Sequence, residues 1–205
     1  SCGRTSNALT GTPLAHLRRR EQWMHHAQAL IEGASVRKAA QCCGVDKNTA
    51  FRWRHRFLQA AAMHRPAHEG GIVEADETFF LESFKGQRKL PRPARKRGGA
   101  GAYFERVAVL VARDRSGQTA DFRLENVDAA HITAVLNPLI DKDAILCTDG
   151  AVIYQKLART MGVTHRAVNV QKGIRVLDGA FHIQNVNAYD SRLKQWMSRF
   201  HGVAT

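Results

Sequence analysis

Apolar side chains recur at helical spacing in the first third of the chain and predict three short helices there. The segment EQWMHHAQALIE forms the first of these patterns. Two further patterns follow it, each after a glycine stop and a short polar cap. The expected helices cover residues 21–32, 35–43 and about 46–59, with Gly33 and Gly44 as stops, Ser35 as the second N-cap and Asp46 or Asn48 as the third.

The second and third of these helices are joined by a turn of about four residues that contains a glycine, which is the pattern of a helix-turn-helix. Ala40 supplies a small side chain where the two helices would cross closely. Trp53 is expected in the core rather than as a stacking platform for a base. The other apolar residues at helical spacing are Trp23, Met24, Ala27, Leu30 and Ile31 in the first helix, and Phe51, Phe57 and Leu58, expected to face inward, in the third.

From residue 72 onward, short apolar runs typical of strands alternate with helical patterns. A hairpin followed by alternating helices and strands predicts an α/β fold with a mixed sheet and helices on its faces. The expected strands cover residues 72–81, 107–112, 118–124, 144–148 and 165–168, and the expected helices run from the cap Asp128 to about Ile140, over residues 151–161 and over residues 182–200.

The last expected helix carries polar residues beside an apolar stripe. At about 100° per residue, Asn187, Asp190 and Lys194 fall within roughly 60° of one another at the edge of that stripe. An amide, an acid and a lysine in this place would complete a metal site and grip a phosphate. The alternative is a solvated polar face with a local Asp190–Lys194 pair. The stripe consists of Ile183, Val186, Tyr189, Leu193, Met197 and Phe200.

Positive charge is concentrated in two segments of the chain. The chain has 205 residues and a formal net charge of +13. Residues 1–68 carry 11 basic and 3 acidic side chains, and residues 85–97 carry seven basic and no acidic ones. The rest of the chain is slightly acidic. Basic proteins often have only a solvated surface, but concentrated charge is typical of proteins that bind phosphate backbones, so we expect double-stranded DNA as a partner.

The two basic segments supply the candidate DNA-binding residues. The N-terminal residues of the third helix would meet base edges, and its arginines would meet phosphates. The second segment contains prolines and glycines, so it is expected to form a loop over residues 85–99. The alternative for the helical module is an ordinary three-helix scaffold with a charged face. The candidates are Lys47, Asn48, Thr49, Arg52, Arg54 and Arg56 in the helix and Lys85, Arg88, Lys89, Arg92, Arg95, Lys96 and Arg97 in the loop.

Composition excludes several other classes of protein. Hydrophobic residues make up 44% of the chain, which excludes wholesale disorder. No apolar run approaches the roughly 18 residues that a membrane span needs, and we expect no membrane partner. Four scattered cysteines do not form a disulfide framework, and no signal segment opens the chain. A reducing cytoplasm is therefore the expected location.

Two aspartates occupy related places in the expected sheet. Asp76 lies in its first strand, and Asp149 lies at the end of the strand that follows the first helix of this domain. Adjacent parallel strands would bring the two carboxylates side by side, which is costly unless a cation lies between them. Mg²⁺ is often bound by one or two carboxylates together with substrate phosphates. Each aspartate alone also has an ordinary interpretation, as a turn residue before Gly150 or as a charge that blocks sheet edges.

Several segments together resemble the DDE-type transposases of bacterial insertion sequences. The branch that fits has an N-terminal zinc ribbon, a helix-turn-helix and a catalytic domain that opens with a strand like VDETYF. The resemblance covers nearly the whole chain and implies an RNase H-like catalytic domain. The matching segments, in order, are CGRTSNALTGTPLA, SVRKAAQCCGVDKNTAFRWRHRF, GIVEADETFFLESFKGQRKLPRPARKRGG, LCTDGAVIY and HIQNVNAYDSRLKQWMSRFHGVAT.

The resemblance also implies site residues. Asp76 and Asp149 fall on the first two catalytic aspartates, Asn187 on the third position, and Lys194 on the lysine seven residues later. Asp76, Asp149 and Asn187 would then hold two Mg²⁺ ions, for which Mn²⁺ substitutes. Asp190 is unusual at its position and would offer the carboxylate that Asn187 lacks.

The resemblance implies a domain order as well. The upstream cysteines of the zinc ribbon are missing, so zinc is not expected in this chain, which looks truncated at both ends. The expected domains are a remnant of the zinc-ribbon-like segment (1–16), the helix-turn-helix module (17–62), a linker (63–71) and the RNase H-like domain (72–205).

The implied function is metal-dependent strand cleavage at transposon ends followed by strand transfer into target DNA. Bringing two ends together implies a homodimer. One alternative is a catalytically impaired remnant that acts only as a sequence-specific DNA-binding protein. Another is a general RNase H-like nuclease, which would cut without specific ends.

Overall fold

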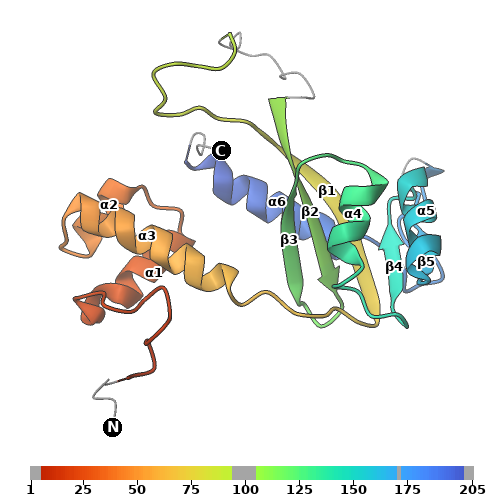
Figure 1. Ribbon diagram of the computed structural model, residues 1–205, viewed down its shortest axis with the longest axis horizontal. Helices are drawn as coiled ribbons and strands as arrows, with labels where there is room; N and C mark the ends of the chain where they lie inside the picture. The colour runs from red at the N-terminus through yellow and green to blue at the C-terminus, as the bar shows by residue number, and fades with distance from the viewer. Residues whose placement is uncertain (1–5, 94–104, 170–171, 201–205) are drawn as a thin grey trace. The chain divides into compact units, whose positions relative to one another are not determined.

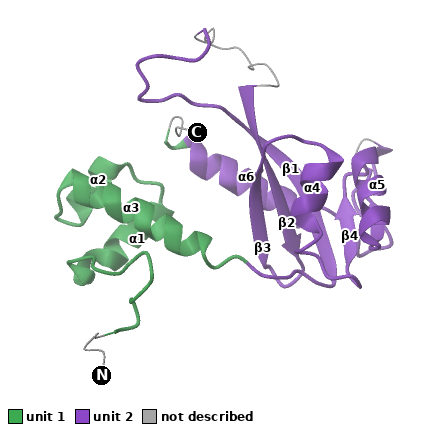
Figure 2. Ribbon diagram, viewed as in Figure 1, with its two compact units in different colours: residues 1–65, 199–201 green, residues 66–198, 202–205 purple. Residues whose placement is uncertain are grey.

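The structure is a computed structural model that describes residues 6–93, 105–169 and 172–200 (Figure 1). The chain divides into two compact units. Unit 1 comprises residues 1–65 and 199–201, and unit 2 comprises residues 66–198 and 202–205 (Figure 2). Within the described ranges, no helix is long and apolar enough to cross a membrane.

The described part of unit 1 contains three α-helices, two of which begin at polar caps. Ser35 accepts a hydrogen bond from the backbone N–H of Lys38 (3.2 Å), and Asp46 accepts one from the N–H of Asn48 (2.8 Å). Of the two candidate caps for the third helix, Asp46 therefore has this role. The elements are the 3₁₀ turn η1 (Arg20–Gln22), α1 (Trp23–Ile31), α2 (Val36–Cys42) and α3 (Lys47–Ala62) (Figure 1).

Aromatic rings form the centre of unit 1. Trp53 of α3 is 3% exposed, and its ring meets that of His26 of α1 edge to face, with the centroids 5.5 Å apart. Phe57 also packs against His26, with the centroids 5.5 Å apart. The burial of Trp53 confirms its predicted place in the core.

Two residues of α3 that were predicted to face inward are exposed instead. Phe51 is 52% exposed and Leu58 is 40% exposed. Each residue of a helix rotates by about 100°, so Phe51 lies about 200° and Leu58 about 140° around the helix from Trp53. A helix that packs through Trp53 turns both of them away from the core, and the prediction for them is wrong.

Among the described residues, unit 2 contains a five-stranded mixed sheet with the strand order β3-β2-β1-β4-β5. β1 pairs antiparallel with β2 and β2 with β3, whereas β1–β4 and β4–β5 are parallel pairs. The strands are β1 (Ile72–Leu81), β2 (Arg106–Asp114), β3 (Thr119–Leu124), β4 (Ile145–Thr148) and β5 (Thr164–Ala167). Together with the flanking helices, this sheet confirms the predicted α/β, RNase H-like fold.

The helices that flank the sheet begin and end at recognisable residues. Asp128 caps α4 by accepting a hydrogen bond from the backbone N–H of His131 (2.9 Å). α4 ends at Leu136 rather than at about Ile140 as predicted, because Pro138 lacks the backbone N–H that a continued helix needs. The three helices are α4 (Ala129–Leu136), α5 (Val152–Met161) and α6 (Gln184–Ser198).

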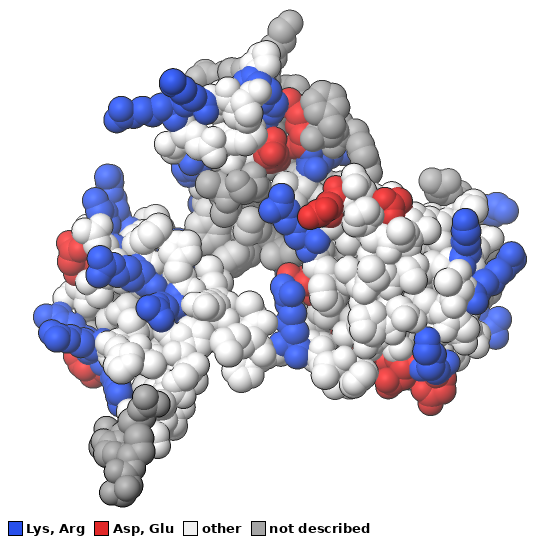
Figure 3. All heavy atoms as spheres, viewed as in Figure 1, with Lys and Arg blue, Asp and Glu red and all other residues white. Residues whose placement is uncertain are grey.

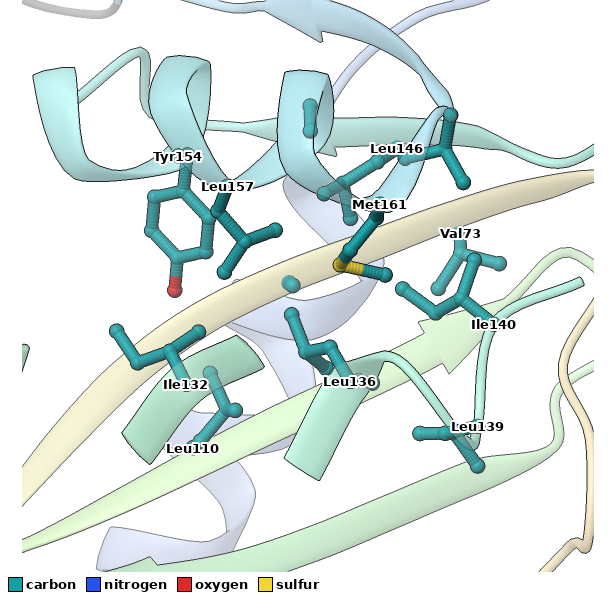
Figure 4. Close-up of a cluster of buried hydrophobic side chains, with 14 of the residues drawn as sticks. Val73, Leu110, Ile132, Leu136, Leu139, Ile140, Leu146, Tyr154, Leu157 and Met161 are labelled. Atoms are coloured by element: carbon teal, nitrogen blue, oxygen red, sulfur yellow. The ribbon is translucent and has the colours of Figure 1, made fainter. Parts of the chain in front are cut away.

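Alternate residues of β1 face opposite sides of the sheet. Val73 and Ala75 belong to the large apolar core that includes side chains of α4 and α5 (Figure 4). Val186 of α6 belongs to a second, smaller cluster with residues of β2 and β4. Because Glu74 and Asp76 alternate with Val73 and Ala75, they lie on the side of the sheet that α6 covers.

Tyr154 of α5 brings a hydroxyl into the larger core, where Figure 4 shows it turned toward β1. The side chain is fully buried and donates a hydrogen bond of 2.6 Å to the Glu77 carboxylate. Burial raises the pKa of the Tyr154 hydroxyl, and the adjacent Glu77 raises it further. Burial also raises the pKa of Glu77, which the hydrogen bond from Tyr154 partly offsets. The pair ties α5 to the middle of β1.

We expect Tyr154→Phe to lower the free energy of unfolding by about 1–3 kcal/mol, because half-buried Glu77 loses its donor while the ring packing stays. Urea unfolding at pH 7 of the wild type, Y154F, E77Q and the double variant measures this. The two single losses should not add in the double variant, since each removes the same interaction. Strictly additive losses, or an unchanged Y154F, would contradict a hydrogen bond that stabilises the fold.

Glu69 is a buried acid at the start of unit 2. It is fully buried, and its backbone is held by Leu139 and Asp141 through hydrogen bonds of 2.8 and 3.0 Å. Burial raises the pKa of its carboxyl to about 8, and the neighbouring Asp114 adds to the shift. The folded protein therefore favours the protonated form of Glu69 at neutral pH.

The raised pKa of Glu69 predicts a stability that falls with pH. Its contribution is complete below the ordinary pKa of a glutamate and is lost as the pH rises toward about 8. Each unit of pKa shift corresponds to about 1.4 kcal/mol. Glu69→Gln, which cannot ionise, should unfold at a higher urea concentration than the wild type at pH 8 and show a weaker pH dependence between pH 5 and 8. Parallel pH curves for the two proteins would refute this assignment.

Candidate active site

The parallel pairing of β1 with β4 brings the two predicted aspartates together. Glu74 of β1 is opposite Cys147 of β4 in the register. Continued by two residues, the same register places Asp76 opposite Asp149, which directly follows β4. Side-chain alternation puts both aspartates on the side of the sheet that α6 covers.

The carboxylate of Asp76 lies in an unfavourable electrostatic environment. Burial raises its pKa, and the charge of Asp149 raises it further. A hydrogen bond of 2.9 Å from the N–H of Glu77 and the charge of Lys194 act in the opposite direction. Two repelling carboxylates, one of them half-buried, are a place where a bound cation stabilises the ionised forms.

A tight turn after β4 holds Asp149 at the surface. Asp149 accepts a hydrogen bond of 2.9 Å from the N–H of Ala151, just before α5. Gly150 between them has a φ of 87°, a conformation that favours glycine. A Cβ at Gly150 would also lie 3.1 Å from the Cβ of Ala167 on β5. The turn therefore needs a glycine to leave the Asp149 carboxylate accessible.

α6 contributes Asp190 to the same region. Its side chain is 6% exposed, and Oδ1 has no hydrogen-bond partner among the residues that the structure describes. Burial raises the pKa of Asp190 to about 7, with a further contribution from Asp76, while Lys194 lowers it. Asp76, Asp190 and Lys194 thus form one electrostatically coupled group.

Asn187, the predicted third ligand, is exposed at the N-terminal part of α6. It lines a surface hollow of about 300 Å³ together with Arg175, Ile183 and Gln184. Within α6, the acid that interacts electrostatically with Asp76 is Asp190, three residues further along. The burial of Asp190 was not predicted, because the helical pattern placed it only at the edge of the apolar stripe.

The residues present fit a hard divalent cation shared with a substrate. No group of three or more His, Cys, Asp or Glu in the described ranges is arranged to hold a metal ion by itself. Mg²⁺ often uses only one or two carboxylates and takes its other oxygens from water and substrate phosphates. The Asp76–Asp149 pair supplies such carboxylates, and the unpartnered Oδ1 of Asp190 adds an oxygen nearby.

The exposed face of α3 carries part of the predicted DNA-binding set. Lys47, Asn48 and Arg52 are exposed, and helical spacing places them on one side of the helix together with Phe51. Basic side chains are prominent on the visible face of unit 1 (Figure 3). Half-buried Thr49 lines a hollow of about 330 Å³ with Arg52 and residues 16–19.

Two other arginines of α3 bind backbone carbonyls within unit 1. Half-buried Arg54 donates a hydrogen bond to the carbonyl of Ala34, between α1 and α2. Arg56 donates one of 3.2 Å to the carbonyl of Pro13. Both were predicted to contact DNA phosphates, and the structure places them where they also hold the module together.

The basic loop is described only in part. Lys85, Arg88 and Lys89 are exposed. Arg92 instead lies 3.7 Å from Glu82 and 3.1 Å from Glu105, the residues that flank the loop. Its guanidinium thus joins the two ends of the loop. Arg95, Lys96 and Arg97 lie outside the described residues.

Comparisons with known proteins agree with this architecture. Residues 69–205 match the family of ISXO2-like transposase domains, and residues 17–62 match the family of homeodomain-like domains. No curated protein matches the chain.

The similar solved structures include a viral intasome and Mos1 transposase assemblies. A chain of the simian T-cell lymphotropic virus intasome in complex with PP2A regulatory subunit B56 gamma is 11% identical, with a TM-score of 0.41, over 88% of this chain and 64% of that one. A chain of a pre-cleavage Mos1 transpososome is 12% identical, with a TM-score of 0.31, over 92% and 81%. The Mos1 mariner paired end complex with Mn is 13% identical, with a TM-score of 0.28, over 96% and 67%. The chain thus spans less than two thirds of the matched chain in the first of these structures.

The family match covers the sheet, both aspartates and α6, and it extends over more than half of the chain. The helix-turn-helix module has its own match in the N-terminal region. The predicted combination of a helix-turn-helix with a transposase domain is therefore confirmed, and the chain belongs to the ISXO2-like transposase family.

Proposed function

We propose that this chain is a transposase that cleaves DNA strands at transposon ends and joins them to target DNA. The observation that supports this most is the β1–β4 register, which brings Asp76 and Asp149 together beside α6. In a sheet of this fold, a carboxylate pair beside a lysine suits the transfer of a phosphoryl group that carries negative charge.

Asp76, Asp149 and Asn187 would hold two Mg²⁺ ions, for which Mn²⁺ substitutes. When bound, a pair of such ions stabilises the attacking and the leaving oxygen of an in-line displacement at phosphorus. Asp190 is electrostatically coupled to Asp76, so its carboxylate would supply a further oxygen ligand for the metal. It would replace Asn187 in this role when Asn187 remains in the surface hollow that it lines.

The residues of the chain position the substrate around this pair. Lys194, exposed on α6, would contact the scissile or a neighbouring phosphate as a point charge. In cleavage, a water oxygen attacks phosphorus, the bond from phosphorus to the 3′ oxygen breaks, and a 3′-OH is left. In strand transfer, that 3′-OH attacks a phosphodiester of the target and releases a new 3′-OH there.

DNA would be held by the two basic segments. Lys47, Asn48 and Arg52 on the exposed face of α3 would meet the element's end, and the exposed basic residues of the loop would grip phosphates elsewhere. Joining two ends in one reaction calls for two copies of the chain, so we propose a homodimer on DNA.

We expect Asp149→Ala to abolish strand cleavage while DNA affinity stays within about twofold of the wild type. The substrate is a duplex that carries the inverted repeat flanking this gene, incubated with Mg²⁺ or Mn²⁺ and resolved on a denaturing gel. The matched control is Asp143→Ala, which removes an exposed acid before β4 and should cut normally.

The outcomes of this assay separate the functions. A wild-type protein that binds the ends but does not cut them with either metal would overturn the enzyme and favour the binding-only remnant. Equal cutting of duplexes with and without the repeat would favour a general nuclease.

The two kinds of arginine in α3 should respond differently to substitution. Arg52→Ala is expected to weaken binding to the end duplex and to reduce the salt dependence of log K by about one charge, without a change in melting temperature. Arg54→Ala is expected to lower stability by about 1–3 kcal/mol, because Ala34 loses a charged donor. Fluorescence anisotropy over a salt series and thermal unfolding measure the two effects. A stable R52A with the DNA affinity of the wild type would contradict the role of this face.

A further inference from the structure

Glu74 is a buried acid that the proposed reaction does not use. It lies two residues before Asp76 on the same face of β1 and is 1% exposed. A charged side chain is buried in this way only when it is paired and hydrogen-bonded. The hydrogen-bond partners of its two carboxylate oxygens therefore indicate its role.

One carboxylate oxygen of Glu74 is paired with basic side chains. Arg115, in the turn between β2 and β3, donates a hydrogen bond to Oε1. Nδ1 of His182 lies 3.3 Å from the same oxygen. Arg115 also donates to the carbonyl of Ala180 (2.8 Å), so the segment that leads into α6 is fastened to this turn.

The other oxygen of Glu74 binds the start of α6. Oε2 accepts hydrogen bonds from the backbone N–H groups of Asn185 (2.8 Å) and Val186 (3.0 Å). The first N–H groups of a helix have no partner inside the helix, and a negative charge is favoured there. Glu74 therefore acts as the N-terminal cap of α6, although it comes from a strand more than 100 residues earlier.

This cap links a fixed point on α6 to a fixed point on β1. From Glu74 to Asp76, β1 advances by about 7 Å. From Val186 to Asp190, α6 advances by about 6 Å. Asp190 lies about one helical turn after Val186, and its carboxyl is electrostatically coupled to Asp76, which lies two residues after Glu74.

We propose that Glu74 is a positioning residue. By capping α6, it fixes the position of that helix along β1 and so holds Asn187, Asp190 and Lys194 in the correct place relative to Asp76. The inference rests on the proposed function, because the position of α6 along β1 affects the reaction only if these residues belong to one active site. Loss of the cap would let α6 shift along β1, and a displacement of about 1 Å from productive geometry can reduce a rate by about 100-fold.

The experiment compares Glu74→Ala, which removes the cap, with Glu74→Gln, which keeps an oxygen for the two N–H groups. Glu69→Gln is the control for replacing an equally buried acid that does not touch α6. Hydrogen–deuterium exchange of the full chain is measured over residues 182–198. Mn²⁺ binding is measured by the EPR signal of the free ion, and cleavage by the gel assay at saturating DNA.

E74A is expected to exchange faster in the first turns of α6, to bind Mn²⁺ about tenfold more weakly and to cut about 100-fold more slowly, with unchanged DNA affinity. E74Q should recover most of the Mn²⁺ affinity and rate, whereas a merely stabilising ion pair with Arg115 would make E74Q as poor as E74A. E69Q should match the wild type in all three measurements.

Two results would overturn the inference. If E74A matched the wild type in hydrogen exchange and Mn²⁺ affinity, Glu74 would have no positioning role, although the proposed function would still stand. Equal defects in E74A and E74Q would assign Glu74 to stability through Arg115. If the wild type itself neither binds Mn²⁺ nor cuts DNA, the proposed function fails, and the positioning role fails with it.

Discussion

The parallel pairing of β1 with β4 is the constraint on which the candidate site depends. Parallel neighbours advance in the same direction, so residues at equivalent positions stay level with each other along the sheet. Here the register leads from Glu74 and Cys147 to Asp76 and Asp149. Neither aspartate has a strong signal alone, and an antiparallel pairing or a one-residue slip would separate them or turn one to the other face. The chemistry therefore follows from the topology of the sheet.

α6 joins this pair from the far end of the chain, and its attachment is electrostatic as well as apolar. Val186 packs on the sheet, but apolar packing alone resists sliding along a strand only weakly. The hydrogen bonds from the N–H groups of Asn185 and Val186 to Glu74 are directional, so they favour one position of α6 along β1. Burial, together with the charge of Asp76, raises the pKa of Asp190, and perturbed pKa values of this kind are common at functional sites.

Local patterns were enough to predict the strands and the last helix, and the predicted parallel strands indicated that Asp76 and Asp149 would lie side by side. Apolar runs and alternation mark β1 and β4, and helical spacing marks Val186 in the stripe of α6. They could not predict that Glu74 caps α6, because that contact links segments more than 100 residues apart. The prediction that Phe51 faces inward was wrong for a related reason. The packing of Trp53 against α1 decides which face of α3 is buried, and Phe51 lies on another face.

The same long-range contacts change the meaning of the positive charge. The formal net charge of +13 counts every basic side chain equally. Arg54 and Arg56 bind carbonyls, Arg92 joins the ends of its loop, and Arg115 compensates Glu74. These arginines hold elements in place, since a guanidinium can satisfy several fixed acceptors at once. Fewer basic side chains are therefore free to contact a phosphate backbone than the composition indicates. Of these arginines, Arg115 also helps to hold Glu74, the acid that caps α6.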